Sequence, residues 1–491
     1  MSTINNRKFH IYTLMAIIIV FIGLFLRIIG LDAPLWGDEI QTWAYSRRSP
    51  IIELWNYASH TPTPPLYYVL NHFMIQSFGI APWALRFLSV IFGILIIPIV
   101  FWGMQEATFS KIDSLLAILL VATSSMLIYY SQEARAYAML AFLSTSSLVL
   151  LFRYFQKHDY ISLILYSISL ILITVTHRYS YLLIVSFFII SIFFRQWRAA
   201  SINLLFIVLI ITGVVVQFMN DSISYGASGD PIDINAIRSL IISLSNGTLG
   251  MQTIAKIPNA PSLKFPQPVL NQLLPVIGVL VLLLVLFIFF KNRRLYNSKQ
   301  KQFITLLIFS IGIPTIIAMF LGSPILPRPQ WLLRGLIYFW PFYFILIIAG
   351  LSKSKAKFWL VPAIVVLNLL SLYPYYISYE RFSNANAFNQ LNQQVSENDL
   401  IVSDPFYMYN LIDYYYDGPA PMVGYHPTYG WIDLKHMASS NEFGPIPLEN
   451  TPNPIGDIYF YYGRFHSDWI ESFPENNIFY YNAESDSWFE Y

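Results

Sequence analysis

The chain has 491 residues, of which 56% are hydrophobic and only 11% are charged, whereas soluble domains carry about 25% charged residues. The net charge of +2 comes without a basic run of the kind that binds nucleic acid. Because cysteine is absent, disulfides and thiolate metal sites are excluded. The composition therefore predicts a polytopic membrane protein.

Apolar segments of about 20 residues, the length that spans a bilayer, recur over the first three quarters of the chain. The first is interpreted as an uncleaved signal-anchor, because the stretch after it makes a poor cleavage site. Backbone groups in lipid must be hydrogen-bonded internally, so the segments are expected to be helices. We predict an all-α transmembrane domain with about eleven helices, over residues 10–31, 82–103, 114–131, 136–152, 160–176, 179–194, 202–219, 269–290, 302–322, 331–350 and 356–375.

The distribution of lysine and arginine predicts the orientation of these helices. With the N-terminus in the cytoplasm, the inner loops hold most of the basic residues, and the short outer loops hold only Arg135, Arg178 and Arg328. This orientation places the amphipathic loop 32–81, the loop 220–268 and the C-terminal region outside the cytoplasm.

The chain is expected to divide into a transmembrane domain over residues 1–375 and a soluble extracytoplasmic domain over residues 376–491. The second region is polar and rich in tyrosine and tryptophan. Short strands at 399–403 and 458–462 alternate with helical stretches near 384–395 and 466–472, which predicts a small α/β domain.

An acidic pair, Asp38 and Glu39, follows the first apolar segment, where a membrane helix would meet water. Carboxylates at that depth are costly to hold, so they are candidate bases, ion ligands or binding groups. His60 and Tyr67 lie further along the same loop in a proline-rich stretch. For that stretch a rigid elbow with an interfacial aromatic is the simpler interpretation.

Further polar clusters fall on the predicted outer side. Glu133, Arg135 and Tyr137 lie within one helical turn, either as site residues or as a solvated turn with one ion pair. The remaining candidates are His177, Arg178, Arg328 and Arg334, although an isolated arginine there can also snorkel to the interface. Arginine clusters grip phosphate, and an aspartate beside them suits a general base. Together these residues suggest group transfer from a lipid phosphate.

Four ordered motifs carry a resemblance to a known family: LDAPLWGDE at 31–39, PPLYYVL at 64–70, ALRFLSVIFG at 84–93 and YYSQEARAY at 129–137. A later stretch at 327–341, with prolines and arginines, also fits. The chain resembles integral-membrane glycosyltransferases of the GT-C fold, in the bacterial branch related to protein O-mannosyltransferases and the lipid A aminoarabinose transferase. The resemblance implies residence in a bacterial plasma membrane.

The resemblance also implies roles for the candidate residues. Asp38 would be the catalytic acidic residue that orients or deprotonates the acceptor, with Glu39 beside it. Glu133 would be a second acidic residue of the site. Arg135 and Tyr137 would hold phosphate or sugar, and the other binding candidates are His60, Tyr67, His177, Arg178, Arg328 and Arg334. Some relatives bind a divalent cation, but the sequence shows no spacing that requires one.

The implied reaction is a single displacement with inversion, from a polyprenyl-phosphate sugar to a hydroxyl of a glycolipid, polysaccharide or protein. No nucleic-acid partner is expected, and no phosphate-binding glycine loop is present. The alternatives are a transporter or flippase, which would be expected to show inverted repeats, a polysaccharide polymerase or ligase, and a non-catalytic binder of a lipid-linked sugar.

Overall fold

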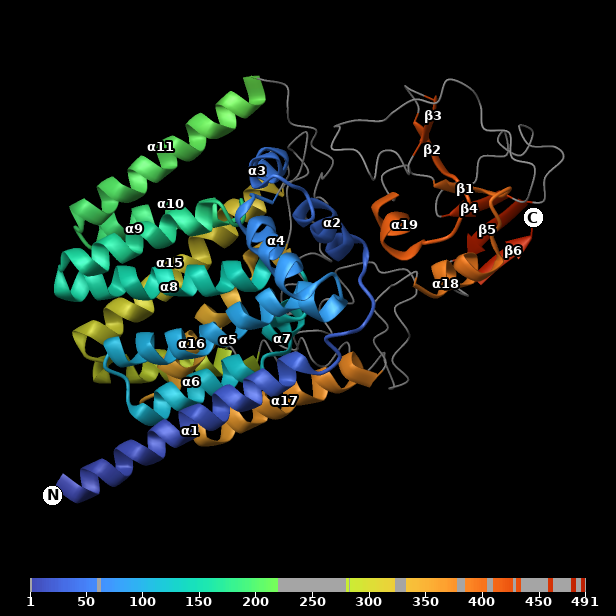
Figure 1. The fold of residues 1–491 in the computed structure, drawn as a ribbon. Coiled ribbons are helices and arrows are strands. Elements are labelled where there is room, and N and C mark those ends of the chain that lie inside the picture. The colour runs from blue at the N-terminus through green and yellow to red at the C-terminus, as the bar shows by residue number, and fades with distance from the viewer. Residues whose placement is uncertain are drawn as a thin grey trace. The chain divides into compact units, whose positions relative to one another are not determined.

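The computed structural model describes residues 2–59, 63–219, 280–281, 283–322, 333–377, 385–403, 409–426, 430–433, 458–461, 478–482 and 487–490. The chain forms two compact units (Figure 1). The first comprises residues 1–31 and 49–379, and the second comprises residues 32–48 and 380–491. The second unit thus takes in part of the loop that follows the first apolar segment.

The first unit is a bundle of apolar helices. Residues 280–281 and 283–292 are also helical. The named helices are α1 (Ser2–Ile28), α3 (Ile51–Ser59), α4 (Leu66–Phe78), α5 (Pro82–Glu106), α6 (Lys111–Thr123), α7 (Ser125–Ser131), α8 (Tyr137–Lys157), α9 (Tyr160–Thr174), α10 (Ser180–Phe193), α11 (Trp197–Met219), α15 (Ser298–Leu321), α16 (Phe339–Leu351) and α17 (Lys357–Ile377), with short 3₁₀ turns η1 (Arg293–Leu295) and η2 (Leu333–Leu336).

Five of these helices are long and apolar enough to cross a membrane: His10–Ile28, Pro82–Glu106, Tyr137–Lys157, Trp197–Val215 and Ser298–Leu321. Shorter apolar helices accompany them at 160–174, 180–193, 339–351 and 357–372. Large apolar side chains face outward, and Phe21 and Phe320 are 65% and 66% exposed. Such a surface suits lipid rather than water. The predicted class of polytopic helical membrane protein is confirmed.

One predicted span differs in form from the expectation. Residues 114–131 were expected to form one helix, but α6 ends at Thr123 and α7 begins at Ser125, with a bend of 55° between them. Ser124 has extended backbone angles, and its hydroxyl accepts the backbone N–H of Leu127 at 3.4 Å. A serine that caps a new helix in this way competes with continuation of the old one.

The end of the bundle where α5 and α8 terminate and α6 and α17 begin carries ion pairs. Arg153 pairs with Glu106, and Lys357 Nζ lies 2.6 Å from Asp113 Oδ1. The connection over residues 291–301 adds exposed basic residues, namely Lys291, Arg293, Arg294, Lys299 and Lys301. We call this the basic end of the bundle. The candidate site described below lies at the opposite ends of these helices.

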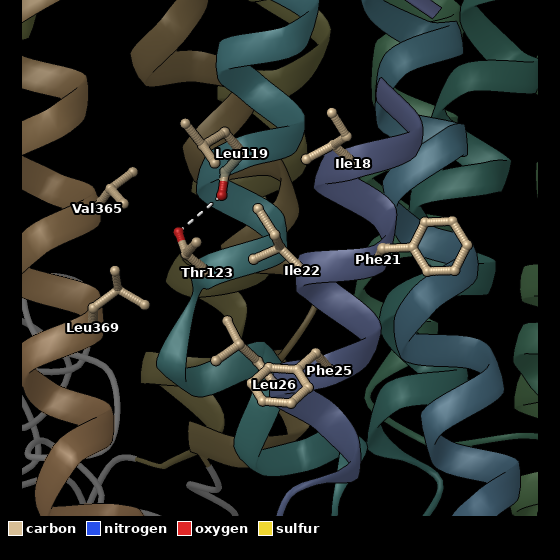
Figure 2. Close-up of a pocket in the computed structure, with 9 residues that line it drawn as sticks. All are labelled: Ile18, Phe21, Ile22, Phe25, Leu26, Leu119, Thr123, Val365 and Leu369. Carbon is tan, nitrogen blue, oxygen red and sulfur yellow. Dashed lines mark hydrogen bonds between the residues drawn. The ribbon is translucent and has the colours of Figure 1, made fainter. Parts of the chain in front are cut away.

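Helix α6 packs between α1 and α17, which come from distant parts of the chain (Figures 1 and 2). The three helices line a groove, and among the described residues that line it Thr123 is the one polar residue, its hydroxyl donating to Leu119 O at 2.8 Å (Figure 2). The other lining residues are Ile18, Phe21, Ile22, Phe25, Leu26, Leu119, Val365 and Leu369. The described lining is therefore almost wholly apolar.

The second unit is built on a six-stranded sheet with the order β3-β2-β1-β4-β5-β6. Strands β2, β1, β4 and β5 run parallel, and the edge strands β3 and β6 pair antiparallel to their neighbours. The predicted α/β character is confirmed, with strands at 400–403 and 458–461 and a helix at 385–394, whereas residues 466–472 lie outside the described residues. The elements are α2 (Gly37–Ser46), α18 (Ala385–Gln394), β1 (Leu400–Ser403), α19 (Tyr409–Tyr415), β2 (Met422–His426), β3 (Gly430–Asp433), β4 (Ile458–Tyr461), β5 (Ile478–Asn482) and β6 (Ser487–Glu490).

Candidate active site

The loop at residues 132–136, between α7 and α8, carries Glu133 and Arg135 and is held by buried hydrogen bonds. The Gln132 amide donates to the carbonyls of Arg27 and Ile29 at 3.0 and 2.6 Å, at the C-terminal end of α1. The side-chain oxygen of Gln132, Oε1, accepts from the hydroxyl of Tyr375 at 2.6 Å. Because C-terminal helix carbonyls lack intrahelical donors, the Gln132 amide satisfies α1 while it fixes the loop.

Arg27 stabilises the helix break that precedes this loop. Its guanidinium is fully buried and donates to the carbonyls of Gly23, Ala122 and Val121 and to Ser131 Oγ, at 3.0 to 3.3 Å. The carbonyls at 121 and 122 belong to the last turn of α6, where a cation is favourable. A buried charge thereby holds the bend between α6 and α7.

We expect Arg27→Met to destabilise the protein by about 3 kcal/mol, because it removes donors from several buried oxygens at once. Thermal unfolding of the purified protein in detergent measures the change. Arg294→Met, at an exposed position on the basic end, is the matched control and should leave the unfolding temperature unaltered. An equal unfolding temperature in both variants would show that the Arg27 hydrogen bonds do not support the bend.

A second chain of hydrogen bonds fixes Arg135 from the side of α4 and α5. Ser89 Oγ donates to the backbone carbonyl of Arg135 at 3.2 Å. Tyr67 Oη and Ser89 Oγ are 2.7 Å apart, and since the serine proton is already used, the tyrosine is the donor. The start of α4 is tied in turn to the end of α9, because Leu66 N donates to Val175 O at 3.1 Å. Tyr67 and Arg135 therefore occupy one connected site.

Tyr137 lies at the centre of an aromatic and cationic cluster. Its ring centroid is 4.9 Å from that of Tyr130 and 5.6 Å from that of His177. The guanidinium carbon of Arg334 lies 5.7 Å from the Tyr137 centroid, within cation–π range. These contacts bring together α7, α8, the turn between α9 and α10, and η2.

Gly335 allows the next element to approach this cluster closely. A Cβ at this position would lie 2.5 to 2.8 Å from ring atoms of Tyr179. The Tyr179 ring therefore packs directly on the η2 backbone, next to Arg334. A larger residue at 335 would force the ring or the turn to move.

His177 is neutral in this surrounding. The side chain is 5% exposed, and its Nδ1 accepts the backbone N–H of Tyr179 at 3.2 Å. Burial, and after it the positive charges of Arg135, Arg334 and Arg178, together lower the pKa of His177 to about 3. A neutral ring with Nδ1 as acceptor carries its proton on Nε2, which is then available as a hydrogen-bond donor.

The low pKa of His177 predicts a loss of stability in mild acid. In the unfolded chain a histidine takes up a proton below about pH 6.5, whereas in the folded chain His177 does not until about pH 3. The free energy of unfolding therefore falls as the pH drops through 6.5, by about 2 kcal/mol at pH 5 from this group alone.

The test compares unfolding temperatures at pH 7.5 and pH 5 for the wild type and His177→Gln. The variant should lose less stability over this range, because its glutamine does not titrate. His10→Gln, at an exposed position, should behave as the wild type does. Parallel pH dependence in all three proteins would contradict the low pKa.

The charged groups of this cluster are mainly positive. Three arginines, Arg135, Arg178 and Arg334, lie near enough to His177 to affect its charge. Glu133 provides a buried carboxylate, 1% exposed, and its backbone carbonyl accepts the N–H of Arg135 at 2.7 Å. With His177 neutral, these groups leave a net positive charge, which suits a bound phosphate. We call these residues, with Tyr67 and Tyr137, the arginine–tyrosine cluster.

Asp38 and Glu39 belong to the second unit, where they occupy the first turn of α2. Glu39 is fully buried, and its carboxylate accepts the backbone N–H of Trp36 at 3.4 Å, which caps the helix. Asp38 is partly exposed in the first turn of α2, at the positive end of the helix dipole. This arrangement gives Glu39 a structural contact and leaves the Asp38 side chain accessible.

His60 and Arg328, two of the residues singled out in the sequence, lie outside the described residues. Among the residues that the structure does describe, no group of three histidine, aspartate or glutamate side chains is placed to hold a metal ion.

Sequence reasoning overlooked the residues that support the cluster. Arg27, Ser89 and Gln132 each hold a backbone segment of the site by hydrogen bonds between distant parts of the chain. Of these three residues, only Arg27 could have been recognised from the sequence. A charged side chain inside an apolar segment is energetically costly, which makes it a candidate for a functional or structural role. Ser89 and Gln132 are ordinary polar residues, and nothing in their local sequence indicates their partners.

The described residues thus form a helical membrane bundle with a cationic and aromatic cluster at one end. Residues 55–220, which supply most of the arginine–tyrosine cluster, match the model of the dolichyl-phosphate-mannose-protein mannosyltransferase family. The motif-based resemblance to GT-C glycosyltransferases is confirmed by this match and by the structural matches that follow.

The structure is similar to two crystal structures of ArnT from Cupriavidus metallidurans. The apo form matches with a TM-score of 0.53 and the form bound to undecaprenyl phosphate with a TM-score of 0.51. In each comparison 12% of residues are identical, over 89% of this chain and 88% of that chain. This likeness shows the fold. No curated protein sequence matches the chain significantly.

Proposed function

We propose that the protein is an inverting glycosyltransferase that moves a sugar from a polyprenyl-phosphate donor to an acceptor hydroxyl. The arginine–tyrosine cluster carries this proposal, because it places several arginines and a neutral histidine at one end of a lipid-facing bundle. The family match over residues 55–220 and the binding of undecaprenyl phosphate by the structurally similar ArnT support the same donor class.

In the proposed mechanism the cluster receives the donor phosphate. Arg135 and Arg334 pair with the phosphate oxygens. Their positive charges stabilise the negative charge that develops on the departing polyprenyl phosphate. His177 Nε2 donates a further hydrogen bond without adding charge. Tyr137, which contacts both Arg334 and His177, orients the two groups.

Asp38 acts as the general base of the proposed reaction. It accepts the proton of the acceptor hydroxyl as the hydroxyl oxygen attacks the anomeric carbon. The bond between that carbon and the phosphate oxygen breaks, and the bonding electrons leave with polyprenyl phosphate. A single displacement inverts the anomeric configuration.

The cluster is proposed to face the extracytoplasmic side. It lies at the helix ends opposite the basic end, where residues 291–301 hold several exposed lysines and arginines. Basic residues are concentrated on the cytoplasmic side of membrane proteins. Nucleotide sugars are not available outside the cytoplasm, so this orientation agrees with a lipid-linked donor.

The test uses the purified protein in lipid with a panel of labelled polyprenyl-phosphate sugars. Release of polyprenyl phosphate is followed with and without a crude envelope fraction as the source of acceptor. We expect release from one donor, dependent on the acceptor. Tight binding of one donor without release would instead indicate a non-catalytic binder, and movement of the intact donor between leaflets would indicate a flippase.

A further inference from the structure

Helix α2, which carries Asp38, packs against α19 although the two are far apart in the chain. Arg47 Nη2, just after α2, lies 2.6 Å from Asp413 Oδ2 in α19. The rings of Trp43 and Tyr414 meet edge to face with centroids 5.0 Å apart. Both contacts lie within the second unit. They join the first loop of the chain to its C-terminal part.

The stretch that contains Asp38 is held on both sides. On its N-terminal side, Tyr415 Oη donates to the backbone carbonyl of Leu35 at 2.8 Å, across 380 residues of sequence. On its C-terminal side, Arg47 pairs with Asp413 and also lies 4.2 Å from the centroid of the Trp43 ring. Asp38 stands between these anchors on a helix of ten residues, about 15 Å long.

Helix α19 is itself fixed to the rest of the second unit. The Asn392 side chain of α18 donates to Tyr415 O at 3.0 Å and accepts from Asp417 N at 3.1 Å. The rings of Phe388 and Tyr415 stack with centroids 6.0 Å apart and an angle of 7° between their planes. The anchors of α2 therefore rest on a packed element rather than on a loose segment.

We propose that α19 positions Asp38 for catalysis, with Arg47, Asp413 and Tyr415 as positioning residues. This inference rests on the proposed function, in which Asp38 is the general base. It assigns the C-terminal part of the chain a role in the chemical step through the geometry of α2. A base misplaced by about 1 Å loses much of its effect, so these contacts should govern kcat more than donor binding.

The experiment reverses the ion pair in three variants: Arg47→Glu, Asp413→Arg and the two combined. Each single change puts like charges opposite each other, and we expect kcat to fall 10- to 100-fold with unchanged affinity for polyprenyl phosphate. The double variant restores opposite charges and should recover most of kcat. Glu397→Arg, an equal change of charge at an exposed position of the same unit, is the matched control and should retain wild-type kcat.

A milder variant distinguishes loss of positioning from misfolding. Tyr415→Phe removes the hydroxyl that donates to Leu35 while it keeps the ring, and we expect a several-fold loss of kcat at an unchanged unfolding temperature. Because the chain contains no cysteine, Arg47→Cys with Asp413→Cys also allows a direct test of the contact. A short bismaleimide should cross-link this pair within one chain.

The outcomes separate this inference from the proposed function. Absence of polyprenyl-phosphate release by the wild type with every donor would overturn the proposed function itself. Release that requires Asp38 but is unaffected by the three single changes would overturn only the positioning role. So would impaired single variants without recovery in the double variant, or failure of the cysteine pair to cross-link.

Discussion

Replacement of Asp38 by asparagine is expected to lower the rate of sugar transfer about 10²- to 10⁴-fold, the usual contribution of a general base. Asparagine keeps the size of the side chain and removes only its ability to accept the acceptor proton. Since Asp38 is not among the residues proposed to pair with the phosphate, the affinity for polyprenyl phosphate should stay the same. Steady-state release of polyprenyl phosphate and equilibrium binding of the same lipid measure the two quantities.

Two variants of the same loop serve as controls. Asp32→Asn changes an exposed aspartate six positions earlier and should leave the rate unaltered. Glu39→Gln keeps a side-chain oxygen that can accept from Trp36 N, so the helix cap and the rate should both persist. A large loss in Glu39→Gln together with normal turnover in Asp38→Asn would transfer the role of base to Glu39.

Much of the membrane architecture could be predicted from the sequence, because lipid imposes a simple rule on it. A segment such as 82–103 has to be apolar and long, and it has to satisfy its own backbone, so α5 could be anticipated. The break at Ser124 could not be anticipated with equal ease. Apolar segments lie on both sides of the short polar stretch 123–125, and the bend depends on Arg27, 94 to 95 residues away in sequence, to satisfy the freed carbonyls.

The candidate site shows the same division. Arg135 and Tyr137 stood out because polar residues are rare in so apolar a chain, and the structure places them beside His177. The contacts that support the cluster could not be predicted, because the Ser89 hydroxyl donates to the backbone carbonyl of Arg135 and Gly335 acts by having no side chain where the Tyr179 ring packs. Contacts of this kind depend on tertiary packing and leave no periodic pattern.

The acidic pair shows why adjacent residues need not share a role. In the sequence Asp38 and Glu39 are equivalent carboxylates, and chemistry alone gave no means of choosing between them. The fold separates them, since the Glu39 side chain is buried and caps α2 whereas Asp38 remains partly exposed. The packing of α2 on α19 could not be predicted either, because the two helices lie near opposite ends of the chain.

Loss of Arg135 or of Arg334, which both lie near His177, is expected to weaken donor binding strongly. Arg135→Gln and Arg334→Gln each remove a charge-assisted contact worth about 1.5–3 kcal/mol, so Kd for polyprenyl phosphate should rise about 10- to 150-fold. Arg334→Lys keeps the charge but loses the planar fork that grips two phosphate oxygens, and it should bind with intermediate affinity. Titration of each variant with polyprenyl phosphate in detergent gives Kd.

The control for these variants is the loss of an arginine that lies away from the arginine–tyrosine cluster. Arg198→Gln provides it, since Arg198 is exposed near the start of α11 and contacts the Tyr160 ring rather than the cluster. If phosphate binding is local, this variant keeps the wild-type Kd while the two cluster variants do not. Equal Kd values in all of them would move the phosphate site away from the cluster, with Arg328 the next residue to replace. A uniform small loss in all three would instead indicate that the lipid is attracted by overall charge, which raised salt would abolish in every protein alike.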